Sequence, residues 1–428
     1  MFETFRNAWK IQDLRKKLLY TLTIIIIFRI GSAIPVPFLD PSALSAMVSE
    51  SGSLFGYFDV ITGGSFSRAT IFALSITPYI NASIIMNLLT VAIPPLERLA
   101  KEGEEGKKKI NQITRFVALG IGLVMAIGFY LTLKSQGAVD YTKGFDGVFA
   151  AIIIISAFTA GASLIIWLGE RINERGIGNG ISMILFASIV SRGPSGIITL
   201  FNSVKLNPAK NAVLVPIVLL LFLAMITFIV LMTNAERRIP IQYAKRVVGR
   251  KMYGGQSTHI PIKVAMSGVM PIIFAMSLMS IPSTIAQFTR PEVNSFGWKF
   301  MRLFSTHSIL YAVIYFFLII GFNYFYVATQ YNPIEIANNL RKNNGGIPGI
   351  RPGKPTSDFI TKVLSKITLL GAMFLGVIAV TPIFFTAASG LNIALGGTSI
   401  LIVVGVALET VRTLESQMMM RHHKGFLE

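Results

Sequence analysis

Residues 212–232 read AVLVPIVLLLFLAMITFIVLM, an unbroken apolar stretch without a charged side chain. A hydrophobic run of about 18 or more residues is long enough to cross the hydrocarbon core of a bilayer as a helix. The chain of 428 residues shares this character, because 53% of its residues are hydrophobic and 14% are charged. Soluble proteins carry about 25% charged residues. The sequence therefore predicts an all-α polytopic membrane protein.

Ten apolar runs are found along the whole chain. They lie near residues 18–33, 69–93, 116–133, 148–168, 177–198, 212–232, 264–287, 309–329, 363–385 and 395–414. Five runs precede the polar gap at 199–211 and five follow it, so we expect an N-terminal half (1–198) and a C-terminal half (199–428). Because each half has an odd number of spans, any internal repeat must have inverted topology.

The basic residues indicate which side of the membrane each loop faces. About three quarters of the 39 Lys and Arg residues lie in the N-terminal segment, the even-numbered loops and the C-terminal tail. Cytoplasmic loops carry an excess of Lys and Arg, so both termini and the even-numbered loops are expected in the cytosol. Arg29 lies inside the first run, near its outer end. Its side chain either snorkels to the interface or makes a structural or functional contact.

The apolar runs lack the groups that ion coupling or catalysis needs. Asp, Glu and His within spans mark ion and proton pathways, and no acidic residue lies at the centre of any run. Metalloprotease, phosphate-loop and nucleophile motifs are absent, and the absence of cysteine excludes disulfides and a zinc ribbon. We therefore expect a passive conduit and not an enzyme, with no cofactor. A ten-helix secondary transporter and a poreless insertase or scaffold are the alternatives.

Residues 56–68, GYFDVITGGSFSR, form a segment that is too short and too polar to span the membrane. The segment lies directly before the second run and contains Gly63-Gly64, a pair that can bend sharply. Irregular backbone at membrane depth is tolerated only inside protein or against water. The segment is thus either folded back into a cavity or an ordinary external loop.

Two long basic loops, residues 234–263 and 332–362, are assigned to the cytosolic side. In the first loop, imperfect alternation over 238–248 and the turn pair Gly254-Gly255 before 257–262 predict a projecting β-hairpin. In the second, residues 343–355 read NNGGIPGIRPGKP and are not expected to be helical. Their Lys and Arg residues suit an RNA or an acidic protein surface, although charge asymmetry alone would also place them here. The length of the loops favours a docked partner.

Four stretches carry a resemblance to a known family. They are residues 63–85 (GGSFSRATIFALSITPYINASII), 174–182 (ERGIGNGIS), 256–263 (QSTHIPIK) and 348–353 (PGIRPG). Together they resemble the SecY family, the central subunits of bacterial protein-conducting channels. The resemblance implies an hourglass of two inverted five-helix halves around a central pore. It also implies a lateral gate between spans 2–3 and 7–8, with Pro271 and Pro282 permitting a hinge in span 7.

The resemblance further assigns residues to the pore. A ring of apolar side chains would form the constriction, and such a ring can block ions by dewetting. Here the ring would comprise Ile76, Ile80, Ile181, Leu185, Ile273 and Ile402. A plug would seal the outer side, formed by Phe58, Asp59, Val60, Ile61, Thr62, Gly63, Gly64, Ser65, Phe66 and Ser67.

The resemblance also implies function and partners. The channel would move unfolded secretory polypeptides across the bacterial plasma membrane and release membrane helices sideways into lipid. Its partners would be the small subunits SecE and SecG, the ATPase SecA and the ribosome, besides signal sequences, translocating polypeptides and the lipid bilayer. SecA and the ribosome would dock on the two long loops through Arg238, Lys245, Arg246, Arg250, Arg351 and Lys354.

Overall fold

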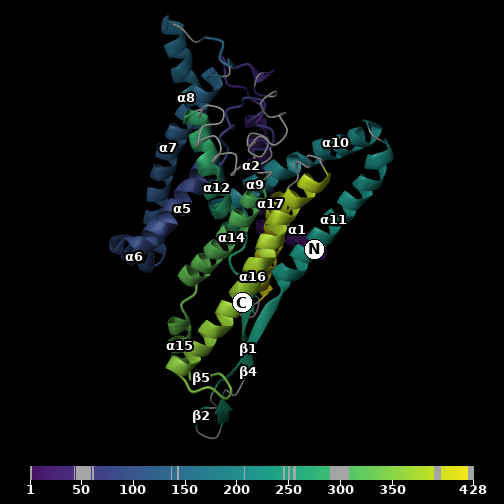
Figure 1. Cartoon of the computed structure of the whole chain (residues 1–428). Helices are drawn as coiled ribbons and strands as arrows, with labels where there is room; N and C mark the ends of the chain where they lie inside the picture. Colours follow the sequence, from purple (N-terminus) through teal and green to yellow (C-terminus); the bar gives the residue numbers. More distant parts are fainter. Residues whose placement is uncertain are drawn as a thin grey trace.

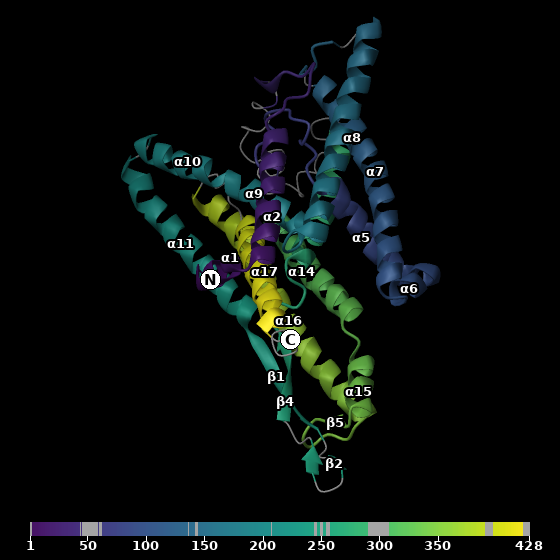
Figure 2. The same cartoon turned by 180° about the vertical axis from the view of Figure 1, so that it is seen from behind.

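A computed structural model describes residues 2–42, 44, 59, 62–135, 137–141, 144–206, 208–243, 246–248, 251–253, 257–289, 308–389 and 397–422. Helices dominate the described residues (Figures 1 and 2). The helices are α1 (Phe2–Lys10), α2 (Gln12–Gly31), α5 (Thr77–Ala92), α6 (Pro94–Lys101), α7 (Glu104–Ser135), α8 (Gly144–Arg175), α9 (Gly180–Ser191), α10 (Gly193–Leu206), α11 (Pro208–Asn234), α12 (Met270–Thr289), α14 (Ile309–Gln330), α15 (Pro333–Lys342), α16 (Lys354–Ser389) and α17 (Gly397–His422).

Each of the ten predicted runs contains a helix. Among the described residues, six helical stretches are long and apolar enough to cross a membrane, or seven if α5 and α6, bent by 100°, form one span. Helices α2, α12 and α17 lie at the other three runs. Large apolar side chains such as Phe116, Leu220 and Phe317 are exposed, as expected of helices that face lipid. The chain is therefore a mostly helical, multi-pass membrane protein, as predicted.

Two of the predicted runs are helical only in their second part. Residues 62–76 form consecutive turns and α5 begins at Thr77, while residues 264–269 form turns and α12 begins at Met270. Pro271 therefore lies in the first turn of α12, where proline breaks no intrahelical hydrogen bond. Of the two predicted hinge prolines, Pro282 alone lies in the helix interior.

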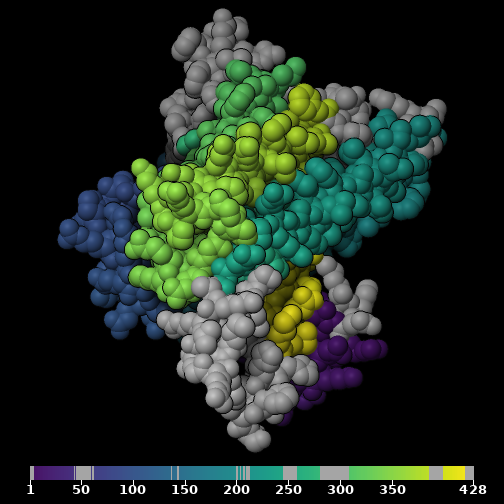
Figure 3. Space-filling view, turned by 90° about the horizontal axis from the view of Figure 1, so that it is seen from below, coloured from purple at the N-terminus to yellow at the C-terminus, as the bar shows by residue number. Residues whose placement is uncertain are grey.

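Three apolar clusters organise the membrane part of the fold. The first draws its residues from α11, α12, α14, α16 and α17, all in the C-terminal half. The second lies in the N-terminal half, between α7, α8 and the turns before α5. The third joins α2, α5, α8 and α9 to α17 and is therefore the place where the two halves meet. The halves are also joined near the chain ends, where α1 packs against α17 and the Thr4 hydroxyl donates to Glu415 at 3.2 Å (Figure 3).

The hairpin predicted at 234–263 is confirmed. Strand β1 (Glu236–Tyr243) pairs antiparallel with β4 (Ser257–Lys263), and β2 (Arg246–Val248) pairs with β3 (Lys251–Tyr253). The stretch 238–248, whose imperfect alternation indicated the hairpin, contains most of β1 and all of β2. The predicted turn pair Gly254-Gly255 lies outside the described residues.

The two long loops form one body, which the sequence did not predict. Strand β5 (Gly345–Gly346) pairs with β1 on the edge opposite β4, giving the order β4-β1-β5. Ile239 and Ile241 of the hairpin pack with Leu340, Ile347 and Ile360 of the second loop. Residues 343–353 are not helical, as expected, but α16 begins at Lys354, so the expectation fails for the last two residues of that stretch. We call the described residues of 236–263 and 333–364 the cytosolic body, after the side of the membrane that the sequence predicts for them.

Candidate pore, plug and docking site

Five of the six residues predicted for the pore ring lie in one apolar cluster or pack against it. Ile76, Leu185 and Ile402 are buried members, with exposed fractions of 0%, 4% and 5%, and Ile80 and Ile181 pack against them. Ile273 is half-buried on α12 and is not among the residues of this cluster. Its backbone N–H donates at 3.3 Å to the carbonyl of Val269, which does pack against the cluster.

The glycine-rich motif at 174–182 explains how Ile181 and Leu185 reach this cluster. A Cβ placed on Gly180 would lie 1.9 Å from the carbonyl oxygen of Gly169 in α8, so only glycine lets α9 begin this close to α8. Asn179 caps α9, because its side-chain oxygen accepts the backbone N–H of Ile181 at 3.1 Å. The motif therefore fixes the start of the helix that carries two ring residues.

Part of the predicted plug is described, namely Asp59 and residues 62–67, which we call the plug segment. Phe58, Val60 and Ile61 lie outside the described residues. Asp59, Thr62 and Ser65 are at most 1% exposed. The segment is thus folded back into the protein, and the alternative of an ordinary external loop is wrong for it.

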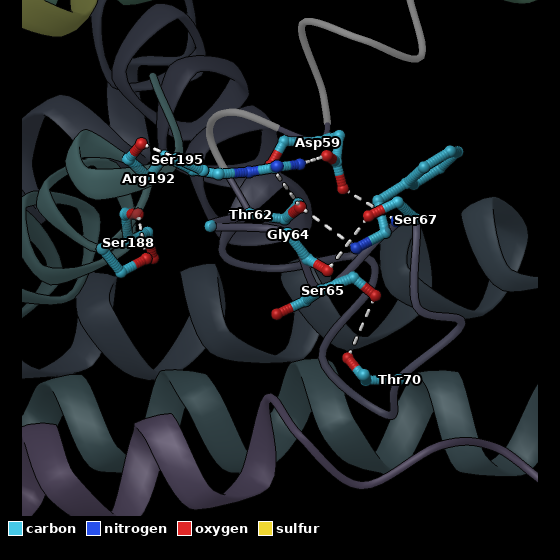
Figure 4. Close-up of polar contacts among 12 residues, drawn as sticks. Asp59, Thr62, Gly64, Ser65, Ser67, Thr70, Ser188, Arg192 and Ser195 are labelled. Atoms are coloured by element: carbon cyan, nitrogen blue, oxygen red, sulfur yellow. Dashed lines mark hydrogen bonds and ion pairs between the residues drawn. The ribbon is translucent and has the colours of Figure 1, made fainter. Parts of the chain in front are cut away.

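Local hydrogen bonds hold the plug segment in its folded form (Figure 4). The carbonyl of Asp59 accepts the N–H of Gly64 at 2.8 Å, and its carboxylate accepts the N–H of Ser67 at 2.7 Å. The chain reverses direction at Gly63 and Gly64, whose φ values of 67° and 86° lie in the region that favours glycine.

Side chains near or on three helices, α2, α7 and α9, contact the plug segment. Arg192, the C-cap residue of α9, forms an ion pair with Asp59 (Figure 4). Arg29 of α2 donates to the carbonyl of Gly63 at 3.4 Å, so this arginine makes a structural contact. The ring centroid of Phe66 lies 4.8 Å from that of Phe129 in α7.

The predicted docking residues lie on the cytosolic body where they are described. Arg238, Arg351 and Lys354 are exposed. The Nε of Arg238 is 2.7 Å from the carboxylate of Glu236. The remaining three predicted residues are not placed: Lys245 and Arg250 lie outside the described residues, and the side chain of Arg246 in β2 is not described.

Sequence reasoning missed two polar sites. One is the Asp59–Arg192 pair, which was signalled only by two lone charges at the ends of apolar segments. The other is an open surface pocket of about 410 Å³ at the root of the hairpin, lined by Lys263, Glu409, Arg412, Thr413, Ser416 and Gln417. Burial and the neighbouring Arg412 lower the pKa of Lys263.

Among the described residues, no group of His, Cys, Asp and Glu can hold a metal ion.

Comparisons with known proteins agree with this arrangement. One similar structure is that of a SecY protein whose plug domain is described as stabilising the closed state of the translocation channel. It matches this chain with a TM-score of 0.66 at 19% sequence identity, and the match covers 94% of this chain and 92% of that one. Sec61 from a canine ribosome-channel complex gives a TM-score of 0.63 at 19% identity with the same coverage. A protein translocase subunit SecY from Streptomyces scabiei is 43% identical to this chain over 438 aligned residues, and the alignment covers 100% of both proteins. Residues 70–411 match the model of the SecY family. Because that match spans most of the sequence and the bacterial relative aligns from end to end, the chain belongs to the SecY family.

Proposed function

We propose that the chain is a passive channel that conducts unfolded secretory polypeptides across the bacterial plasma membrane. The observation that carries this proposal is a buried plug segment that forms an ion pair with Arg192 at the end of α9, the helix that also supplies Ile181 and Leu185 to an apolar cluster. Family membership supports it, since the Streptomyces relative is named a translocase subunit.

The apolar cluster suits a constriction for polypeptides of any sequence. Its proposed ring residues are aliphatic, so they offer a crossing chain no fixed hydrogen bonds and select no particular side chain. In the closed state they pack on one another, and an apolar constriction of this kind resists ions by dewetting. Val269, just before α12, already packs against this cluster. A movement of α12 toward the cluster would bring Ile273 into the ring.

A lateral gate is proposed at the seam between the halves. Helix α12 contacts α5 and α7 across this seam, and both partners belong to the other half of the chain. Opening the seam would let an apolar segment leave the pore sideways and enter lipid, where its side chains are stable. This supports release of signal sequences and membrane helices.

The proposed partners act mainly from the cytosol. The excess of Lys and Arg supports a cytosolic position for both termini and the cytosolic body. SecA and the ribosome would dock on that body near Arg238 and Arg351, and the Sec61 structure was itself solved in a ribosome complex. The small subunits SecE and SecG would complete the channel. Energy would come from SecA, the ribosome or the proton-motive force.

A single cysteine tests the function and the pore position together, because the chain has none of its own. Ile80→Cys would be combined with a secretory substrate that carries one cysteine and is stalled by a folded C-terminal domain. With SecE, SecG, SecA and ATP in membranes, we expect a disulfide that disappears without ATP.

The matched control is Ile85→Cys on the same helix, since Ile85 is 41% exposed and should form no disulfide. Continued transport without a cross-link at position 80 would place the pore elsewhere. No transport at all with the partners present would reject the proposed function.

A further inference from the structure

The open pocket of about 410 Å³ lies where the hairpin meets the end of α17 (Figures 1 and 2). Lys263, the last residue of β4, lines it from the hairpin. The residues that line it from α17 are Glu409, Arg412, Thr413, Ser416 and Gln417. All of these side chains are polar or charged, so the pocket suits a ligand that is itself charged or strongly polar.

The helical repeat places this pocket on the same face of α17 as a proposed ring residue. Glu409, Thr413 and Ser416 follow Ile402 by about two, three and four turns of an α-helix. Ile402 is buried in the central apolar cluster, whereas Glu409 is exposed, and the helical rise separates the two by about 10 Å. A polypeptide that approaches the ring from the side of the hairpin therefore passes the pocket first.

The pocket holds two cations that form no ion pair with any residue that the structure describes. The Arg412 guanidinium donates to two neutral oxygens, the Thr233 carbonyl at 2.9 Å and the Asn234 side chain at 2.7 Å. These hydrogen bonds fix the guanidinium in place and leave its positive charge uncompensated. Burial and, next, the charge of Arg412 lower the pKa of Lys263, and Glu236 opposes them. Two like charges held side by side attract an anion.

One acidic side chain lines the pocket as well. Glu409 lies one turn before Arg412 on α17, is exposed and forms no ion pair within the described part of the chain. Glu409 therefore does not neutralise the cations, but it would repel an anion bound beside them. Lys263 and Glu409 are thus expected to act on an anionic ligand in opposite directions, which distinguishes binding from a structural role.

We propose that this pocket is a subsite that binds acidic side chains of a polypeptide on its way to the ring. The inference rests on the proposed function, because it takes Ile402 as a residue that a crossing polypeptide contacts. Lys263 and Arg412 would hold an Asp or Glu carboxylate by its charge, so the subsite selects acidic stretches and no particular sequence. Such stretches would be held here before they enter the apolar ring, where an unpaired charge is strongly unfavourable.

Protection of a single cysteine tests the subsite, because the chain has none of its own. Thr413→Cys would be combined with secretory substrates that lack cysteine and are stalled by a folded C-terminal domain. One substrate carries a run of Asp just before the ring, and the other carries a run of Asn of the same length. With SecE, SecG, SecA and ATP in membranes, the acidic substrate should slow alkylation by N-ethylmaleimide about threefold more than the Asn substrate. Added salt should reduce this ratio, since exposed charges are screened.

Charge variants in the same background identify the groups responsible. Lys263→Gln should bring the ratio between the two substrates close to one, Lys263→Arg should retain it, and Glu409→Gln should increase it. The matched control is Lys366→Gln, because Lys366 is an exposed lysine of α16 that does not line the pocket. Its ratio should equal that of the chain with Lys366 intact.

The outcomes separate the subsite from the channel. Equal protection by the Asp and Asn substrates, a change in the same direction for Lys263→Gln and Glu409→Gln, or loss of the ratio in Lys366→Gln would each overturn the subsite. The disulfide at Ile80→Cys would still form in these cases. If that disulfide and all protection of Thr413→Cys are both absent, the proposed channel itself is overturned.

Discussion

At the scale of single residues, two positions determine how the centre of the molecule packs. Gly180 allows α9 to begin against the backbone of α8. Ile402 of α17 is 5% exposed in the cluster where α17 packs against helices of the N-terminal half. One residue thus needs to be small and the other apolar, and both requirements can be tested.

Gly180→Ala should destabilise the protein by about 1–3 kcal/mol, because the added Cβ would lie 1.9 Å from the Gly169 carbonyl oxygen and α9 would have to shift. Thermal unfolding of the purified complex in detergent measures the change. Gly193→Ala is the control, since a Cβ there meets nothing within 4 Å. Equal melting temperatures for both variants would contradict the close packing.

Ile402→Asn should open the closed channel to ions, because a buried amide brings water into an apolar constriction. We expect a higher resting conductance in planar bilayers and export of substrates with defective signals. Met419→Asn on the same helix is the control, since Met419 is 68% exposed. Conductance like that of wild type would argue against Ile402 as a ring residue.

At the scale of elements, polar side chains and strand pairing join segments that are distant in sequence. Asn323 of α14 is buried, receives the hydroxyl hydrogen bond of Ser267 before α12, and donates to the carbonyl of Thr368 in α16 at 2.9 Å. It thus ties the start of the proposed gate helix to two neighbours. The cytosolic body is held in a similar way by β1, which pairs with a strand on each side.

Asn323→Leu should cost about 1–2 kcal/mol, because the Ser267 hydroxyl and the Thr368 carbonyl both lose their partner in a membrane interior. Unfolding in increasing denaturing detergent measures this loss. Thr227→Val is the control, since the Thr227 hydroxyl is exposed and bonds only the Leu223 carbonyl of its own helix. A loss of stability no larger than that of the control would show that the hydrogen bonds of Asn323 add little to the stability of the protein.

Arg351→Glu should weaken SecA-driven export several-fold, because it reverses a charge on an exposed loop of the cytosolic body. The effect should diminish as the salt concentration rises, since exposed charges are screened. Arg341→Glu, the same reversal at an exposed arginine of α15, serves as the control for general loss of charge. Wild-type export by the Arg351 variant would remove this residue from the docking site.

At the scale of the whole molecule, the sequence predicted the spans well because apolar length is a strong signal. It predicted the positions of turns less well. Residues 69–76 and 264–269 belong to runs that were predicted to be helical, yet they are not helical and have left-handed backbone at Ala69, Ser75 and Gly268. Phe72 stacks on Phe28 and Ser267 donates to Asn323, and no local sequence pattern encodes contacts with residues so far away in the chain.

The candidate site was predicted by resemblance more than by pattern. Without the resemblance, Ile76 and Ile402 would be read as ordinary core residues, because burial and apolarity are common to both roles. The ion pair of the plug segment and the joining of the two cytosolic loops needed the structure, since both depend on residues far apart in the sequence.

Deleting residues 62–67 distinguishes a channel from a poreless scaffold at this scale. A channel that has lost its plug segment should conduct ions at rest, because the outer face of the constriction is no longer covered. Single-channel recording measures the leak, and the intact chain in the same bilayer is the control. Unchanged conductance would favour the scaffold.

Strand β4 ends at Lys263 and the chain passes directly through residues 264–269 into α12. A strand rises about 3.3 Å per residue, so β4 is a stiff rod roughly 23 Å long attached to the base of the proposed gate helix. Pairing with β1 on its long side makes this rod resist bending. If a partner docks on the hairpin as proposed, a force that it applies to β4 would reach α12 through residues 264–269.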